Sequence, residues 1–212
     1  MSLWKLLTAA YDSSGNSAKV RIDSSTSSLQ TVDYAHHEIH SGSMYRVQAF
    51  DDAIASSGTL VIAFKVKDGG KFPHFIFEWE TEGKATITLY EGVGTDASTG
   101  TDVVVKNSRR DAANSSIIQG YATGSWVDGY ITKNPTFDTG GTGPNAVPTD
   151  SGTIISLKKA YSSSKAGGSS GSRRSEIVLN DNTEYAIVLI NNEATAQGGQ
   201  LRLEWYEHTD NN

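Results

Sequence analysis

Polar and apolar residues alternate along several separate segments of this chain, which is the pattern of strands with one buried face. In residues 72–80, the side chains of Phe75, Phe77 and Trp79 fall on one face of an extended strand, and polar or charged residues dominate the other. Residues 84–90 and 200–207 alternate in the same way. The pattern therefore predicts strands in these three segments and in seven more: 44–50, 59–67, 101–105, 116–121, 153–161, 176–179 and 183–191.

Short strands separated by turn residues, without a long helical segment, are typical of an antiparallel sandwich or barrel. We predict an all-β protein, an antiparallel β-sandwich of jelly-roll-like type, preceded by an N-terminal arm. The turn residues Glu82 and Gly83 between two alternating segments also favour a β-hairpin. The expected core consists of the inward residues of the strands: Val61, Phe75, Phe77, Trp79, Ile87, Leu89, Val188, Leu201, Leu203 and Trp205.

The amino-acid composition changes near residue 31, and this change divides the chain into an N-terminal arm and one domain. Residues 1–31 form the predicted arm, whose serine-rich tract at 23–28 is too polar to order itself and is typical of a tether. Ahead of this tether, Trp4, Leu6 and Leu7 are large apolar side chains, and we expect them to dock onto a partner. Residues 32–212 form the predicted sandwich, with long loops near 124–152 and 162–175.

The net charge and the cysteine content exclude several kinds of binding partner and of reactive site. The 212 residues carry a formal net charge of −6, which makes the chain a poor partner for nucleic acid, because non-specific binding rests on cationic side chains. The absence of cysteine excludes disulfides, thiolate metal sites and cysteine nucleophiles. No run approaches the roughly 18 apolar residues of a membrane span, and we find no export signal, so we expect no membrane partner.

The most conspicuous polar cluster is the sequence His36-His37-Glu38-Ile39-His40. On a strand His36, Glu38 and His40 would share a face, whereas on a helix His36 and His40 would share one. Either arrangement could present ligands to a divalent metal, with His36 and His40 as the candidates, although the spacing differs from the His-Glu-x-x-His motif. We favour the alternative that His36, His37 and His40 organise the start of a strand or a subunit contact. Assembly should then weaken as the imidazoles become protonated below neutral pH.

No set of residues forms a recognisable catalytic or cofactor site. There is no Gly-x-Ser-x-Gly elbow, and the glycine-rich stretches at 140–143 and 167–171 lack the Lys-Ser/Thr ending of a phosphate loop. Glu78, Glu80 and Glu82 alternate as expected for the solvated face of an antiparallel strand. We therefore predict a protein that is not an enzyme and has no cofactor and no metal.

Two arginine pairs interrupt polar segments, at Arg109-Arg110 and Arg173-Arg174. Arginine is enriched at protein interfaces, so Arg109 and Arg110 are candidate partner contacts. Two solvated turns would explain these pairs equally well.

Several stretches together resemble a group of tailed-bacteriophage virion structural proteins. Residues 32–45 (Val-Asp-Tyr-Ala-His-His-Glu-Ile-His-Ser-Gly-Ser-Met-Tyr) are similar to the start of these proteins, and residues 200–208 (Gln-Leu-Arg-Leu-Glu-Trp-Tyr-Glu-His) to their ending. Between them, Leu-Tyr-Glu-Gly at 89–92 and Asn-Ser-Arg-Arg at 107–110 match a turn and a loop of that group. The likeness covers residues 32–120 and 176–208 discontinuously and supplies no catalytic residues.

The resemblance implies a head decoration, cement or head-fibre component that binds the capsid surface. The expected partner is the major capsid protein or another virion protein, in a virion assembled in the host cytoplasm. We also expect a homo-oligomer, for example a trimer. An alternative is a carbohydrate- or receptor-binding β-sandwich domain of a tail or fibre protein, with Trp126, Tyr130 and Phe137 as the stacking aromatics. A hydrolase with its site in residues 124–152 is the weakest of the three interpretations.

Overall fold

The computed structural model describes residues 10–11, 17–18, 34–96, 100–113, 115–122, 125–137, 152–162, 164–170 and 176–209. The chain divides into two compact units, Met1–His37 and Glu38–Asn212. In the first unit, β1 (Ala10–Tyr11) pairs antiparallel with β2 (Ser17–Ala18). The predicted boundary near residue 31 and the predicted docking residues Trp4, Leu6 and Leu7 lie outside the described residues.

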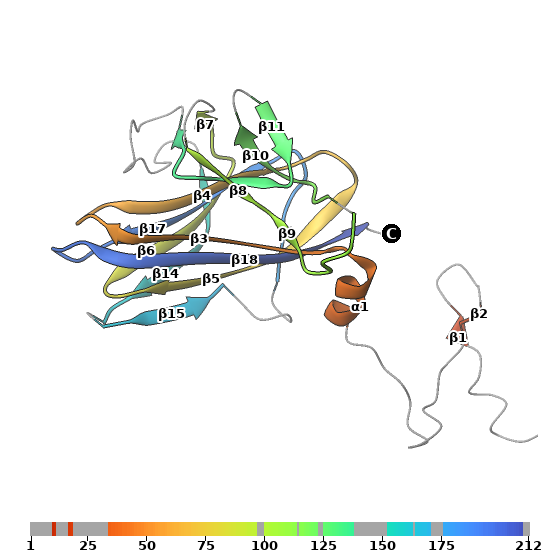
Figure 1. Ribbon diagram of the computed structural model, residues 1–212, viewed down its shortest axis with the longest axis horizontal. Helices are drawn as coiled ribbons and strands as arrows, with labels where there is room; N and C mark the ends of the chain where they lie inside the picture. Colours follow the sequence, from red (N-terminus) through yellow and green to blue (C-terminus); the bar gives the residue numbers. More distant parts are fainter. Residues whose placement is uncertain are drawn as a thin grey trace, which may run out of the picture. The chain divides into compact units, whose positions relative to one another are not determined.

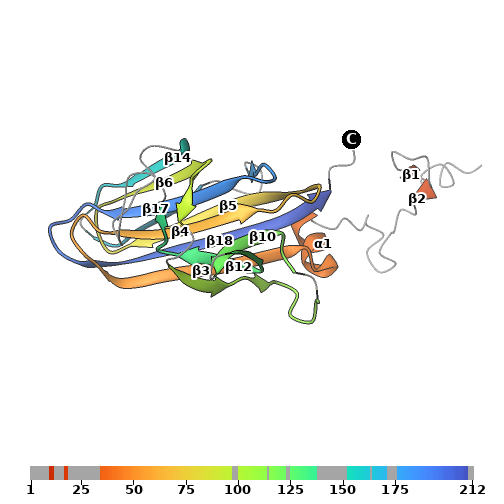
Figure 2. The same ribbon diagram turned by 90° about the horizontal axis from the view of Figure 1, so that it is seen from above.

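The second unit is an antiparallel β-sandwich, as the alternation predicted, and its strand order is that of a jelly roll (Figures 1 and 2). One sheet has the order β15-β5-β18-β3 and the other the order β4-β17-β6-β14. The outermost strands in sequence pair with each other, β3 with β18, and the pairing proceeds inwards through β4 with β17, β5 with β15, and β6 with β14. The bounds of these strands are β3 (Met44–Ile54), β4 (Thr59–Val66), β5 (Lys71–Thr81), β6 (Ala85–Glu91), β14 (Thr153–Ala160), β15 (Ala166–Ser169), β17 (Glu184–Asn191) and β18 (Gln197–Thr209).

All ten predicted core residues are buried, and eight of them form the core between the two sheets. Phe64 of β4 and Phe75 of β5 meet across the sandwich with ring centroids 5.6 Å apart. Tyr45 stacks on Trp205 at 5.9 Å. Val61 and Val188 are also buried, but they belong to a second cluster together with Val93, Phe137 and two alanines. The sheet that contains β4 and β17 is therefore covered on both faces, which explains the continuous apolar run of β4.

The connection from β6 to β14, residues 92–152, forms additional strands rather than only a loop. β10 (Ile118–Ala122) and β12 (Tyr130–Lys133) pair with β4, while β9 (Lys106–Asn107) pairs with β3, so this segment protects an edge of each sheet. The prediction of a long loop near 124–152 is thus wrong for its described part, which extends the sheet through backbone hydrogen bonds. The remaining strands are β7 (Thr95–Asp96), β8 (Thr101–Val104), β11 (Ser125–Asp128) and β13 (Thr136–Phe137).

The predicted loop near 162–175 also contains a strand, β15, and it is followed by β16 (Ile177–Val178); both pair with β5. Sequence propensity missed β15 because its centre is Gly167-Gly168. A Cβ on Gly168 would lie only 2.9 Å from the Trp79 ring, so glycine permits the close approach of this strand to the tryptophan.

The predicted hairpin at Glu82-Gly83 does not form. These residues connect β5 of one sheet to β6 of the other, and the two strands are not paired. A Cβ on Gly83 would lie 2.2 Å from Oε1 of Gln197. Glycine is therefore needed where the β5–β6 connection passes close to the start of β18. The partners of β5 and β6 come from strands more than 60 residues away in sequence, and local turn residues carry no information about them.

Candidate functional site

The histidine cluster lies on a short helix, α1 (Tyr34–Ser41), and not on a strand. The helix ends in a Schellman motif, in which the Gly42 N–H donates to the Ile39 carbonyl oxygen at 3.1 Å and the Ser43 N–H donates to the Glu38 carbonyl oxygen at 3.0 Å. Gly42 adopts a φ of 77°, a left-handed conformation that glycine tolerates without strain. The residues Ser41-Gly42-Ser43 thus terminate the helix, and β3 follows them directly.

His37 and His40 are exposed, and the side chain of His36 lies outside the description. Four residues apart on a helix, His36 and His40 fall on one side of it. Within the described part of the chain, no three histidine, aspartate or glutamate side chains come together as a metal site would require. The role of these histidines in a subunit contact stays a prediction.

Arg109 meets the end of α1. Its Nη1 donates to the His40 carbonyl oxygen at 2.6 Å, and Nδ2 of Asn107 donates to the Gly42 carbonyl oxygen at 2.8 Å. These side chains satisfy two carbonyl oxygens at the helix terminus. The Arg109 guanidinium also donates to Asp111 from Nε at 2.9 Å, and this bond lowers the pKa of the Asp111 carboxyl.

Arg110 is exposed and lines a hollow of about 320 Å³ together with Tyr45, Lys106 and Tyr130. Of the two predicted contact arginines, Arg110 is therefore the one that forms no ion pair with a described residue, whereas the Arg109 guanidinium binds the helix end and Asp111. The second arginine pair, Arg173 and Arg174, lies outside the described residues.

A buried carboxylate lies where β18 passes the start of β10. Glu207 is 4% exposed, and its Oε1 accepts hydrogen bonds from Ser116 Oγ at 2.5 Å, the Ile117 N–H at 2.9 Å and Trp205 Nε1 at 3.2 Å. Burial raises the pKa of the Glu207 carboxyl, although these donors favour its ionised form. Ser116 is buried as well, so this network anchors the start of β10 and presents no accessible serine hydroxyl.

The outer face of the β15-β5-β18-β3 sheet carries the alternating acids, and Glu78, Glu80 and Glu82 are exposed as predicted. Phe50 lies opposite Gln200, and Gln200 lies opposite Glu80, so these three side chains form one row across the sheet. The phenyl ring of Phe50 is 59% exposed in this otherwise polar face. Sequence analysis placed Phe50 in a strand but did not identify it as a surface aromatic.

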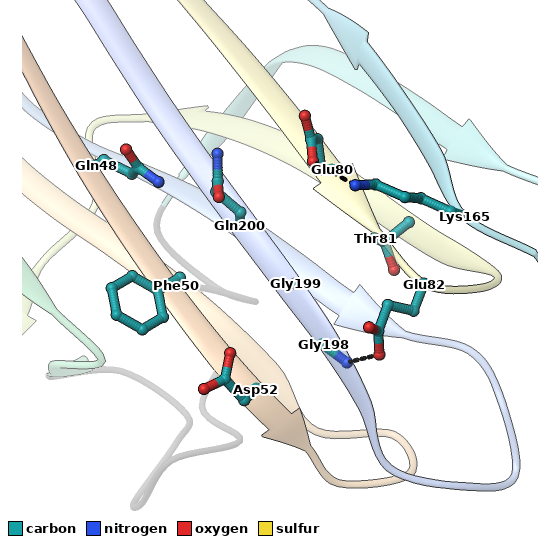
Figure 3. A pocket seen from close by; sticks show the side chains of 10 residues that line it. All are labelled: Gln48, Phe50, Asp52, Glu80, Thr81, Glu82, Lys165, Gly198, Gly199 and Gln200. Carbon is teal, nitrogen blue, oxygen red and sulfur yellow. Dashed lines mark hydrogen bonds and ion pairs between the residues drawn. The ribbon is translucent and has the colours of Figure 1, made fainter.

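Two adjoining hollows lie on this face and share Glu80 and Gln200. The first, of about 250 Å³, extends over β3, β18 and β5, as Figure 3 shows. The second, of about 390 Å³, continues towards β15. Lys165 lines the first hollow, and its Nζ lies 3.3 Å from Oε2 of Glu80. We call the two hollows together the outer-face trough. Its further lining residues include Gln48, Phe50, Asp52, Glu78, Glu82, Gly167, Gly198 and Arg202.

The free edge of the other sheet exposes apolar side chains. Among the described strands only β6 pairs with β14, and a β-bulge interrupts that pairing between Ile154 and Ser156. Ile154, Ile155 and Leu157 of this strand are exposed, and so is Tyr161 directly after it. We call these four residues the β14 edge. Exposed apolar groups on an unpaired strand edge are typical of interaction sites.

The three loop aromatics of the carbohydrate-binding alternative do not form a platform. Phe137 is buried in the second cluster, so its assignment as a stacking residue is wrong. Trp126 packs edge-on against Tyr121 at 5.0 Å, with Lys65 Nζ 6.0 Å from its ring. Tyr130 lines the hollow that also contains Arg110.

No described helix is both long and apolar enough to cross a membrane. No protein-family model, curated protein or solved structure matches this chain.

Proposed function

We propose that this protein is a non-enzymatic structural component of a bacteriophage virion, which binds the capsid surface as a decoration, cement or head-fibre protein. The observation that carries the proposal is the β14 edge, an exposed apolar strip on a protein whose jelly-roll architecture is common among viral capsid proteins. The resemblance of residues 32–45 and 200–208 to tailed-phage virion proteins supports the same conclusion.

The chemistry of the β14 edge suits a protein surface. Ile154 and Leu157 leave about half of their area in water, and burying such a side chain fully yields roughly 1.5–3 kcal/mol. The unpaired backbone groups of an edge strand can add hydrogen bonds to a partner strand. Lys158 and Lys159 follow Leu157, so an acidic rim on the capsid protein would complement this edge.

The test is to purify virions of the phage that encodes the chain and to measure its copy number by mass spectrometry. Cryo-electron microscopy then assigns the copies to the head or to the tail. Absence of the chain from purified virions would contradict the proposal, and copies at the tail tip would favour the receptor-binding alternative.

A matched pair of variants then tests the surface itself. Ile154 and Val178 are β-branched residues with 53% and 52% exposure, and Val178 lies on β16 in the other sheet. We expect Ile154→Asp to bind capsids that lack the protein at least about tenfold more weakly than the wild type, and Val178→Asp to bind them normally. Equal binding of the two variants would remove the β14 edge from the interface.

A further inference from the structure

Phe50 is an aromatic side chain that lies exposed on the surface of the sheet. It lies on the outer face of β3, with Gln48 and Asp52 two residues before and after it on the same face. Across the sheet, Gln200 and then Glu80 continue its row at the strand spacing of about 4.8 Å. Phe50 thus offers one exposed apolar surface bordered by polar side chains along its own strand and across the sheet, and such polar groups can orient a ligand that packs on the ring.

The amides of Gln48 and Gln200 face this row with their hydrogen-bonding capacity unused. No described residue of the chain donates to or accepts from either side-chain amide. Each amide offers two donor hydrogens and one acceptor oxygen, and Asp52 adds two acceptor oxygens beside them. Figure 3 shows Gln48, Phe50 and Asp52 in succession on β3, with Gln200 on the neighbouring strand.

Glycines line part of the trough, and their lack of a side chain leaves space above the sheet. Gly167 lies opposite Glu80, and Gly198 lies beside Glu82, whose Oε2 accepts the Gly198 N–H at 2.8 Å. A Cβ on Gly198 would lie 3.0 Å from the Glu82 carboxyl carbon, so a larger residue would displace this carboxylate. The trough is therefore a built depression, open along the sheet from Phe50 to Gly167.

The charges around the trough select against anions. Its lining includes four acidic residues (Asp52, Glu78, Glu80 and Glu82) and two basic ones (Lys165 and Arg202). Both basic groups already face acids, since Lys165 lies 3.3 Å from Glu80 and Arg202 Nη1 lies 3.7 Å from Glu78 Oε2. The acidic residues that face no basic group leave a negative electrostatic potential at the trough. This potential repels carboxylated, sulfated and phosphorylated ligands.

We infer that the outer-face trough binds neutral sugar rings of an oligosaccharide. The apolar C–H face of a pyranose packs on the exposed phenyl ring of Phe50. Its hydroxyl groups, each both donor and acceptor, pair with the amides of Gln48 and Gln200 and with the carboxylate of Asp52. The next sugar along the chain lies over Gln200 towards Gly167. This inference goes beyond capsid binding and does not rest on it, because the trough and the β14 edge belong to different sheets.

The experiment uses the full-length chain on an array of neutral glucose, galactose, mannose and N-acetylglucosamine oligosaccharides, with sialylated and uronic-acid oligosaccharides alongside. We expect binding to at least one neutral series and none to the acidic ones. The tightest-binding oligosaccharide is then titrated by calorimetry. We expect Phe50→Ala to weaken binding by about tenfold or more, and Gln200→Ala by several-fold.

Tyr161→Ala is the matched aromatic control, because Tyr161 is 80% exposed but lies at the β14 edge. It should bind the oligosaccharide like the wild type, and all three variants should keep the wild-type circular dichroism and melting temperature. Binding to no neutral oligosaccharide at millimolar concentration would overturn the inference. So would binding that Phe50→Ala leaves unchanged, because the site would then lie elsewhere. Capsid binding by Phe50→Ala, measured in parallel, separates this result from the fate of the proposed function.

Discussion

Ser116 Oγ donates a 2.5 Å hydrogen bond to Oε1 of Glu207, and both side chains are buried although they are 91 residues apart in sequence. This bond ties the beginning of β10 to the last strand of the other sheet. Because Trp205 Nε1 donates to the same oxygen, the carboxylate joins the core to the 92–152 segment. The second oxygen, Oε2, is buried without a hydrogen-bond partner among the described residues, so ionised Glu207 carries an uncompensated desolvation cost.

The first prediction concerns the pH dependence of stability. Burial raises the pKa of Glu207, so the folded chain keeps a proton at pH values where the unfolded chain has released it. The free energy of unfolding therefore falls as pH rises from the unfolded carboxyl value, about 4.3, through the raised folded value. Glu207→Gln lacks this titration. We expect urea unfolding between pH 4 and pH 8 to show a pH-dependent decline in the wild type that the variant lacks, of about 1.4 kcal/mol for each pH unit by which the pKa is raised.

Ser116→Ala provides the comparison for this measurement. Removal of the hydroxyl donor leaves the ionised carboxylate less stabilised, so the decline should extend to higher pH than in the wild type. Identical pH profiles for wild type and Glu207→Gln would show that Glu207 titrates alike in the folded and unfolded chains.

The second prediction concerns Asn191, which is buried at the end of β17. Its Nδ2 lies within hydrogen-bond distance of the carbonyl oxygens of Ile54 at 2.9 Å, Ala55 at 3.1 Å and Thr195 at 2.8 Å. It thereby links the β3–β4 and β17–β18 connections. We expect Asn191→Asp to lower the unfolding free energy by about 3 kcal/mol or more, because a carboxylate would face three carbonyl oxygens.

The control for Asn191 is the neighbouring Asn192, which is exposed and donates from Nδ2 to Thr86 Oγ1 at 2.8 Å. Asn192→Asp should change the unfolding free energy by less than about 1 kcal/mol in the same denaturation series. A similar loss for both variants would mean that charge, and not the buried carbonyl cluster, sets the cost.

The third prediction concerns the terminus of α1. Gly42→Ala places a Cβ at a φ of 77°, which costs roughly 1–2 kcal/mol. Gly42→Asn should cost less, because asparagine tolerates the left-handed region. Hydrogen exchange of the Gly42 and Ser43 amides should accelerate in the order wild type, Asn, Ala. Equal exchange in all three would argue against the Schellman motif as the helix stop.

The fourth prediction tests the N-terminal arm. Deletion of residues 1–11 removes Trp4, Leu6 and Leu7, which we expect to dock onto a capsid or oligomer partner. The melting temperature of the sandwich should stay unchanged, while the occupancy on virus particles falls. Trp4→Ala alone should reduce occupancy in part. Full occupancy after the deletion would remove the arm from the interface.

Local pattern was enough to predict ten strand segments and ten buried residues. The ten segments predicted as strands all contain strands in the structure, because alternation with period two reflects one buried face and needs no knowledge of the partner strand. The same parity places Glu207 on the face of Leu203 and Trp205, so the sequence did contain a signal for the buried carboxylate. The absence of long helical periodicity likewise indicated the all-β class.

Only the tertiary structure decided which strands pair with each other, and therefore which side chains come together on the surface. Gly83 resembles a hairpin turn locally, yet β5 and β6 lie in different sheets, where they pair with β18 and β17, more than 90 residues further along the chain. Phe137 resembles an exposed loop aromatic, but the 92–152 segment folds it onto Val61 and Val188. Phe50, in contrast, is exposed on the outer face of its strand, and only the assembled sheet places it in one row with Gln200 and Glu80. Side-chain alternation is a property of neighbouring residues, whereas a binding surface depends on strands that are brought together across most of the chain.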